Sequence, residues 1–365
     1  MADYGSLVSN LSGLLSSDPA GSTAARPPAF APQATPRSSE RLAILGDDVV
    51  ATSLRARAEA AGWSVDSVTL FPGQAGGEGP GLGEQCVLAV SRATVVAITT
   101  PATSHNTLSV LLRDCVPADA IVLLVPGQTG GALEIAHSLR GTGEGPTVAE
   151  LSWRPWASLG AAAVVDVPAI PLATVPAEAA PAVAGRLAPL FDAVPVLSAL
   201  WTGLHAPDLI LRTIPSLLAA GVPDHGTPGR SLGEILSRQA ARGMVTALEL
   251  DRLAVAEAFD LDLPPLVEWL AATLGTPAVR LEVALGPLAD IQVPEVTDPY
   301  WLADLAPSGL APLCALADRV GVQARTARGL LRLAEAMLGN DYELGGRSAE
   351  AMGLAASRQP TAMAA

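Results

Sequence analysis

The sequence contains no lysine. Its 22 basic residues are all arginines, which therefore supply all of the fixed positive charge. This absence excludes mechanisms that need a lysine Schiff base, a lysine general base or the lysine of a phosphate-binding loop. Acidic residues outnumber the arginines, 36 against 22, and the formal net charge is −14. Such a charge repels nucleic acid and anionic membranes, so we expect neither as a partner.

Cysteine and long apolar runs are also scarce. Cys86, Cys115 and Cys314 lie in apolar segments without Cys-x-x-Cys spacing, which indicates buried thiols in a reducing compartment and argues against a metal site. No apolar run reaches the roughly 20 residues that a membrane-spanning helix needs, and the N-terminus lacks the pattern of a signal peptide. We therefore expect a cytoplasmic protein with no bound metal.

The 365 residues suffice for two domains and a large core. Residues 1–40 are rich in Pro, Ala and Ser, which predicts a disordered leader. We predict an α/β Rossmann-type dinucleotide-binding domain over residues 41–193, an all-α C-terminal domain over residues 194–355 and a flexible tail over residues 356–365. The predicted strands cover residues 42–45, 65–71, 95–99, 121–125 and 165–175, the helices cover residues 52–61, 106–113, 177–191, 209–220, 231–258, 265–274, 310–320 and 324–338, and a Gly-rich loop covers residues 74–83.

Residues 94–134 carry the clearest strand, helix, strand pattern. The two apolar runs are continuous rather than alternating, as is typical of parallel strands buried on both faces. Ligands sit beyond the carboxyl ends of such strands. The turn at Thr100-Pro101 and the turn PGQTGG at residues 126–131 would lie there, and the glycines of the second turn would let backbone amides approach a ligand.

The first β-α-β segment is the expected place for a Gly-x-Gly-x-x-Gly fingerprint, and Gly46, Asp48 and Ala51 occupy its three glycine positions. Alanine is small enough for the third position. Asp48, with Asp47 beside it, would however face a pyrophosphate at the helix N-terminus. At ~4 Å and an effective dielectric of ~20, each like-charge pair costs about 4 kcal/mol. The usual cofactor pose is therefore heavily penalised unless these carboxylates point away.

Several segments resemble the octopine/nopaline (opine) dehydrogenase family. TTPATSH at residues 99–105 and PGQTGGALE at residues 126–134 are similar to that family's TPAxxH and PGxTGGAxE turns. Ala149-Glu150 followed by Pro155-Trp156-Ala157 is similar to its AE…LPYA segment, and His205 falls at its catalytic histidine. The pattern DY…GR…GL over residues 341–354 resembles the end of its helical domain. The similarity runs from about Arg41 to Leu354.

The resemblance implies that the chain reduces an imine, formed between an amino acid and a 2-oxo acid, with NAD or NADP as the cofactor. It implies a small-molecule substrate in an interdomain cleft, and we allow for a homodimer. His205 would be the acid–base catalyst and Asp304 its carboxylate partner. The implied cofactor-binding residues are Gly46, Ala51, Thr100, Pro101, Pro126, Gly127, Thr129, Gly130 and Gly131, and the substrate-binding residues are Trp156, Trp201, Arg212 and Arg347.

The chain departs from the family around the histidine. Trp201 and Arg212 replace two asparagines, Leu159 replaces an arginine, and the aspartate that orients the histidine falls on Leu305, beside Asp304. Apolar surroundings without a carboxylate partner would keep His205 neutral and make it a poorer acid.

Three functions stay open on the sequence alone. They are an NAD(P)H-dependent oxidoreductase of opine-dehydrogenase type, a non-redox enzyme such as a cyclase or isomerase, and a non-catalytic binding protein. The tryptophans near the expected cleft either form an apolar pocket or pack the domain interface. Arg212 and Arg347 either bind a ligand or form salt bridges, and His205 and His105 either act on a ligand or serve the structure.

Overall fold

The computed structural model describes residues 40–69, 82–140, 145–158, 164–220, 230–294 and 301–354. All of them belong to a single compact unit, Ser39–Ala365. The predicted tail and most of the predicted leader and Gly-rich loop lie outside these residues. Glu40, which we assigned to the leader, belongs to the packed body, because its carboxylate pairs with Arg186 Nη2 at 2.7 Å.

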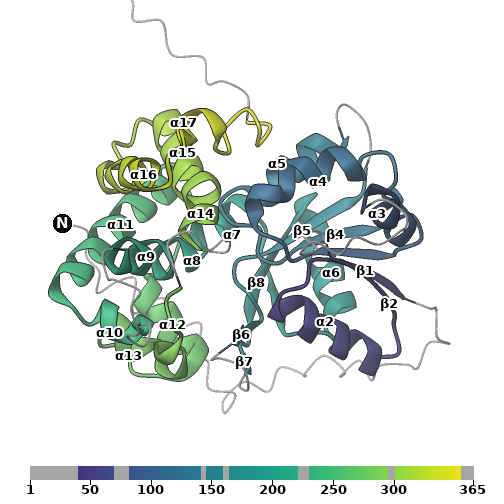
Figure 1. Ribbon diagram of the computed structural model, residues 1–365, viewed down its shortest axis with the longest axis horizontal. Helices are drawn as coiled ribbons and strands as arrows, with labels where there is room; N and C mark the ends of the chain where they lie inside the picture. The colour runs from purple at the N-terminus through teal and green to yellow at the C-terminus, as the bar shows by residue number, and fades with distance from the viewer. Residues whose placement is uncertain are drawn as a thin grey trace, which may run out of the picture. The chain divides into compact units, whose positions relative to one another are not determined.

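A seven-stranded sheet forms the first half of the described chain (Figure 1). Its strands lie in the order β2-β1-β3-β4-β5-β8-β9, with β1 to β5 parallel, β8 antiparallel to β5, and β9 parallel to β8. A separate hairpin pairs β6 with β7. The strands are β1 (Arg41–Leu45), β2 (Ser64–Val68), β3 (Val95–Ile98), β4 (Ile121–Leu124), β5 (Thr147–Leu151), β6 (Trp156–Ser158), β7 (Val164–Asp166), β8 (Ile170–Val175) and β9 (Ala193–Pro195).

Helices cover both faces of this sheet, which explains the continuous apolar runs. In β4, Ile121 and Leu123 pack into one core, whereas Val122 and Leu124 pack into the other, as the two-residue period of a strand requires. The first core is closed by α2 (Val49–Ala60) and α6 (Ala180–Leu187), and the second by α3 (Leu82–Val90), α4 (His105–Leu112) and α5 (Gly131–Arg140) (Figure 1).

After β9 the described chain is helical, apart from one isolated bridge between Ser231 and Gln292. The burial pattern explains why these segments are helices: in α16, Ala327, Leu330, Leu331 and Ala334 are buried at the spacing of one helix face. No helix in the described ranges is long and apolar enough to cross a membrane. The helices are α7 (Ala199–His205), α8 (Asp208–Leu211), α9 (Thr213–Ala219), α10 (Leu232–Leu236), α11 (Gln239–Ala258), α12 (Leu266–Leu274), α13 (Leu281–Ala284), α14 (Leu302–Leu305), α15 (Ala311–Val320), α16 (Arg325–Leu338) and α17 (Tyr342–Gly345).

The predicted fold class is confirmed: a Rossmann-like sheet with helices on both faces precedes an all-helical part. The boundary at residues 193 and 194 stays a prediction, because Ser39–Ala365 is one compact unit. Residues 165–175 form parts of two strands rather than one, and residues 209–220 and 231–258 each form two helices. These breaks span only one to three residues, too few to interrupt the apolar periodicity. Strand β5 was not predicted, because Glu150 interrupts its apolar run.

The strand order predicts where a sheet of this kind binds its ligand. Neighbours of β1 are β2 on one side and β3 on the other, so the chain winds in opposite directions from β1. Doubly wound sheets bind their ligands at such a switch point, beyond the carboxyl ends of the two strands. Those ends are followed here by Gly46 and Thr99.

Candidate functional site

Gly46 ends β1 in a backbone conformation that favours glycine. Its φ is +142°, a region that L side chains rarely adopt. A Cβ atom there would overlap Thr99 Oγ1 and lie 3.3 Å from the backbone N of Thr100. Gly46 thus lets the turn after β1 pack directly on the turn after β3, while Ala51, 5% exposed, packs inside α2. The first and third positions of the fingerprint therefore suit a dinucleotide-binding fold.

Asp48 occupies the N-terminus of α2 with its own carboxylate. It is the N-cap residue, and its Oδ1 accepts a hydrogen bond of 2.9 Å from the backbone N–H of Ala51. Asp48 is half-buried, whereas Asp47 is exposed. In dinucleotide-binding folds the pyrophosphate takes this helix N-terminus. Of the two carboxylates that the sequence analysis questioned, Asp48 is therefore the one that conflicts with a phosphate.

A cavity of about 300 Å³ opens beside the Asp48 cap. Its walls come from the start of α2, the segment between β5 and β6, and the helical part of the chain. Apolar side chains, including Leu211 and Leu288, form much of the lining. The polar and aromatic groups around it are Asp48, Trp153, Arg154, Trp156, Asp208, Arg212 and Trp301.

Two guanidinium groups converge on one buried carboxylate in this cavity. Asp208 is 1% exposed, and its Oδ1 accepts from Trp153 Nε1 at 2.8 Å and lies 3.1 Å from Arg212 Nε. Arg154 Nη1 lies 3.7 Å from the other carboxylate oxygen, Oδ2. Arg212 also lies over the ring of Trp301, 5.3 Å from its centroid. Both guanidinium groups line the cavity, and a guanidinium fork binds carboxylate oxygens in pairs.

Trp156 and Arg212 were predicted as substrate-binding residues and line this cavity, whereas Arg154 and Asp208 were not predicted. Arg154 stands five residues before Leu159, the position at which the resembled family carries its arginine. The only signal in the sequence was an arginine between two tryptophans, Trp153 and Trp156. Only folding brings that segment against Asp208 of α8.

His205 lies in an aromatic box rather than beside a carboxylate. Its ring stacks on Trp201 with centroids 4.5 Å apart and meets the edge of Trp269 at the same separation. It is 1% exposed, and its Nδ1 has no hydrogen-bond partner among the described residues. Burial, together with the nearby charge of Arg252, lowers the pKa of His205 well below its usual value. Its side chain is therefore neutral near pH 7, as its apolar sequence neighbours indicated.

Asp304 bonds to a different partner from the one predicted. Its Oδ1 accepts a hydrogen bond of 2.9 Å from the backbone N–H of Thr103, which ties α14 to the turn after β3. The structure shows no hydrogen bond between Asp304 and His205 in the described residues. Burial raises the pKa of Asp304 to about 6, although the Thr103 hydrogen bond and the arginines around it act in the opposite direction. The predicted pairing of His205 with Asp304 is thus replaced by two separate buried groups.

The predicted ligand turn at residues 126–131 is packed against the protein itself. Every residue of it is buried. A Cβ atom on Gly127 would overlap Glu150, one on Gly130 would overlap Met352, and one on Gly203 of α7 would lie 2.7 Å from the backbone N of Gly130. The glycines thus admit protein groups from β5, α7 and the C-terminal segment. Ligand contacts by Pro126, Gly127, Thr129, Gly130 and Gly131 stay a prediction.

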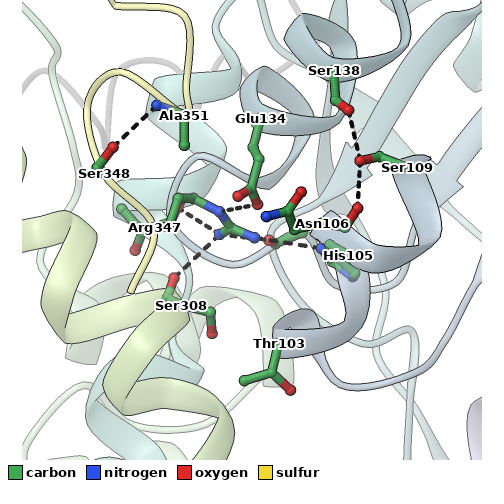
Figure 2. Close-up of polar contacts among 12 residues, drawn as sticks. Thr103, His105, Asn106, Ser109, Glu134, Ser138, Ser308, Arg347, Ser348 and Ala351 are labelled. Atoms are coloured by element: carbon green, nitrogen blue, oxygen red, sulfur yellow. Dashed lines mark hydrogen bonds and ion pairs between the residues drawn. The ribbon is translucent and has the colours of Figure 1, made fainter. Parts of the chain in front are cut away.

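Arg347 joins this turn to the C-terminal segment, and Figure 2 shows its contacts with Glu134, Ser308 and His105. Its Nε pairs with Glu134 of α5 at 2.7 Å, and its Nη1 donates to the carbonyl of Thr129 at 2.7 Å. The same Nη1 lies 3.3 Å from the carbonyl of Ser308, and Nη2 lies 3.5 Å from His105 Nδ1. Burial and this guanidinium lower the pKa of His105 to about 3. Arg347 was predicted to bind substrate. In the structure it is a buried clamp, which holds α5, the turn at residues 126–131 and the segment around Ser308 together.

Thr100 and Pro101, the other predicted cofactor contacts, do lie at the switch-point crevice. Both are buried, and the hydroxyls of Thr100 and Ser104 are 2.7 Å apart. Trp201, predicted to bind substrate, donates from Nε1 to the carbonyl of Asp262 at 2.7 Å and covers His205. The structure thus brings Gly46, Thr100 and Pro101 together at one edge of the sheet and places Trp156 and Arg212 in the adjoining cavity.

No protein-family model matches the chain. An opine dehydrogenase from Arthrobacter sp. (strain 1C) is 29% identical over 299 residues, which cover 78% of this chain and 82% of that protein. The structure of octopine dehydrogenase in complex with NADH and agmatine aligns with a TM-score of 0.66 and 16% identity over 86% of this chain and 96% of that chain. A PanE/ApbA family ketopantoate reductase from Ralstonia eutropha JMP134 aligns with a TM-score of 0.55 and 13% identity over 84% of this chain and 99% of that chain. The structural likenesses establish the fold, and the curated relative agrees with the motifs found in the sequence.

Proposed function

We propose that this chain, which belongs to the opine dehydrogenase family, is an NAD(P)H-dependent oxidoreductase that reduces an imine of a 2-oxo acid or the 2-oxo acid itself. The cavity next to the turn after β1 carries the proposal. It places the arginine pair Arg154 and Arg212, together with three tryptophans, beside the dinucleotide-type crevice. The carboxylate of a 2-oxo acid would contact the two arginines there, and the apolar part of the same substrate would contact the tryptophans.

The cofactor would be held at the switch point of the sheet. Gly46 and Ala51 keep the turn after β1 and the start of α2 close to the strands, and Thr100 and Pro101 form the neighbouring strand end. When bound, the nicotinamide ring supplies the hydride. The residues at this edge would hold the cofactor beside the cavity and exclude water from it.

Arg212 and Arg154 would bind the carboxylate of the substrate. A guanidinium fork binds carboxylate oxygens in pairs, and Asp208 holds both side chains at the cavity. Trp156, 2% exposed, and Trp301 provide apolar walls for the rest of the molecule. Arg347 and Trp201 support the site from the buried contacts already described.

The reduction also needs a proton on the nitrogen or oxygen of the substrate. Asp304 is suited to hold it, because its pKa is raised to about 6, near the pH at which a general acid works best. Asp304 lies one helical turn after Trp301, which lines the cavity. His205, kept neutral by burial, would accept rather than donate a hydrogen bond at its unprotonated nitrogen.

The direct test is a reductive-amination assay with the purified chain. Oxidation of NADH or NADPH should be followed with pyruvate alone, with amino acids alone and with both together. Turnover that requires both substrates supports imine reduction, whereas turnover with the 2-oxo acid alone supports simple reduction. Failure of both cofactors to bind or react at millimolar concentration contradicts the proposal.

Arg212 offers a sharper test of substrate binding. An Arg212→Met variant should raise the KM for the 2-oxo acid about 10- to 100-fold, because a hydrogen bond to a charged group is worth about 1.5–3 kcal/mol. Arg57→Met is the matched control: Arg57 also lies 5.3 Å over a tryptophan, Trp156, but outside the cavity. An equal effect of the two variants on KM would remove Arg212 from the substrate site.

The Asp48 cap favours a second candidate function. Because this carboxylate accepts from the Ala51 N–H, the same cavity could serve a non-redox enzyme or a binding protein that takes an anionic, partly apolar ligand without a dinucleotide. Turnover or tight binding of such a ligand in the complete absence of nicotinamide cofactor would support this function. The cofactor titration described next separates the two.

A further inference from the structure

We propose that the carboxylate of Asp48 is a built-in competitor of the cofactor, so that a dinucleotide binds only after this side chain leaves the N-terminus of α2. The inference rests on the proposed function, because it concerns the cofactor of the same site. It assigns Asp48 a role in setting cofactor affinity, at a position where the fingerprint calls for glycine.

The geometry supports direct competition. The Ala51 N–H points to the first turn of α2, where backbone N–H groups lack partners within the helix. Asp48 Oδ1 takes the Ala51 N–H at 2.9 Å. A phosphate oxygen bound to the same N–H would have to occupy the position of Oδ1. Asp48 and a bound phosphate therefore compete for this donor.

The charges around the cap lead to the same conclusion. The helix dipole favours an anion at its N-terminus, and Asp48 supplies one in this structure. Asp48 and Val49 also line the cavity that contains Arg154 and Arg212. Because Asp48 is half-buried at this cavity and holds the Ala51 N–H through its side chain alone, a change of its side-chain conformation frees that N–H without movement of α2.

Asparagine separates the charge of Asp48 from its capping function. Asparagine caps a helix as well as aspartate does, so Asp48→Asn should leave the melting temperature of the cofactor-free protein unchanged while removing the charge. Asp47→Asn is the matched control, because it removes the same charge one residue earlier from an exposed side chain. Asp48→Gly restores the fingerprint and serves as a second variant.

The experiment is a titration of each full-length variant with NADH and with NADPH, followed by nucleotide fluorescence and by calorimetry. We expect Asp48→Asn and Asp48→Gly to bind at least about tenfold more tightly than the native chain, since removal of one like-charge contact near a phosphate is worth that much or more. Asp47→Asn should stay within about threefold, because its charge is exposed and screened.

Each outcome has a distinct meaning. Equal affinity of the native chain, Asp48→Asn and Asp48→Gly overturns the inference but leaves the proposed function intact. Binding by Asp48→Asn without binding by the native chain supports the inference and contradicts NAD(P)H dependence of the native protein. Absence of binding in all four proteins overturns both. A gain in Asp47→Asn equal to that in Asp48→Asn shows a general charge effect and also overturns the inference.

Discussion

Glu150 is the residue whose protonation state follows most directly from its contacts. It is fully buried, and its two carboxyl oxygens meet the backbone N–H of Ala132, at 2.7 Å, and the hydroxyl of Thr202. The same hydroxyl lies 2.8 Å from the carbonyl of Ala199. Thr202 has one hydroxyl proton, so it cannot donate to both. A protonated Glu150 resolves the conflict by donating to Thr202, in agreement with burial raising its pKa to about 7.

The protonation of Glu150 makes stability depend on pH. The folded pKa of about 7 lies above the ordinary glutamate value of 4.5, so the stabilisation from this group is complete below pH 4.5 and is lost as the pH rises through 7. Glu150→Gln, which keeps a donor for Thr202, should therefore gain stability relative to the native chain between pH 5 and pH 8. The gain at pH 8 should reach about 3 kcal/mol, measured by urea unfolding.

The control for this comparison is Glu234→Gln on the exposed face of α10, where the side chain is 53% exposed. This change should alter stability by less than about 0.5 kcal/mol at every pH. If the difference between Glu150→Gln and the native chain stays constant from pH 5 to pH 8, Glu150 is ionised throughout that range.

The turn at residues 126–131 lies where the sequence predicted it. The groups that pack on its glycines, however, come from the protein and not from a ligand. The turn follows β4, as predicted, and leads into α5, and its two adjacent glycines do permit a close approach. The approaching groups belong to the protein: Glu150, Gly203 and Met352 pack on the glycines, and Arg347 bonds to two of its carbonyls. The same glycine requirement thus arises from packing between elements.

This packing predicts a large effect for Arg347→Met. The substitution leaves Glu134, 8% exposed, without its ion-pair partner, and breaking a buried pair in this way costs about 3–5 kcal/mol. The loss should appear as a lower urea midpoint of the whole chain. Arg328→Met, at an arginine whose partner Asp318 is 66% exposed, should change stability by less than about 0.5 kcal/mol. A similar small loss for both variants would show that the Arg347 clamp contributes little.

Across the whole molecule, buried contacts join the sheet to the helical part. Asp304 of α14 accepts from Thr103, Ser308 accepts from the N–H of Thr129, and Thr202 of α7 contacts Glu150. The first core also continues from the α2 face of the sheet into the helical part without interruption. The predicted boundary at residues 193 and 194 therefore crosses an extensive buried interface.

These contacts predict a single unfolding transition for the described body. Tryptophan fluorescence and far-UV circular dichroism should give coincident urea curves, because neither part keeps its core when the other unfolds. Two separated transitions would instead support independent domains on either side of residue 193. The predicted homodimer and cytoplasmic location can be addressed on the same purified chain and in cells, by light scattering and by fractionation.

The sequence by itself determined the fold class and the place of the crevice. Apolar runs buried on both faces predict parallel strands, and β1, β3 and β4 lie where these runs are. Gly46, Thr100 and Pro101 were assigned to the strand ends for the same reason. The motifs of the helical part also indicated the family, because they are local patterns of a few residues that survive divergence.

Only the tertiary structure decided the partners of the polar groups. Ion pairs and hydrogen bonds such as Arg347 with Glu134 or Asp304 with Thr103 join residues about 200 positions apart, so no local pattern specifies them. The pKa values of His205 and Glu150 depend on burial, which is likewise a property of the packed molecule. The sequence could not show whether the Asp48 carboxylate points towards the N-terminus of α2 or away from it. Its hydrogen bond with the Ala51 N–H shows that it lies at the helix N-terminus.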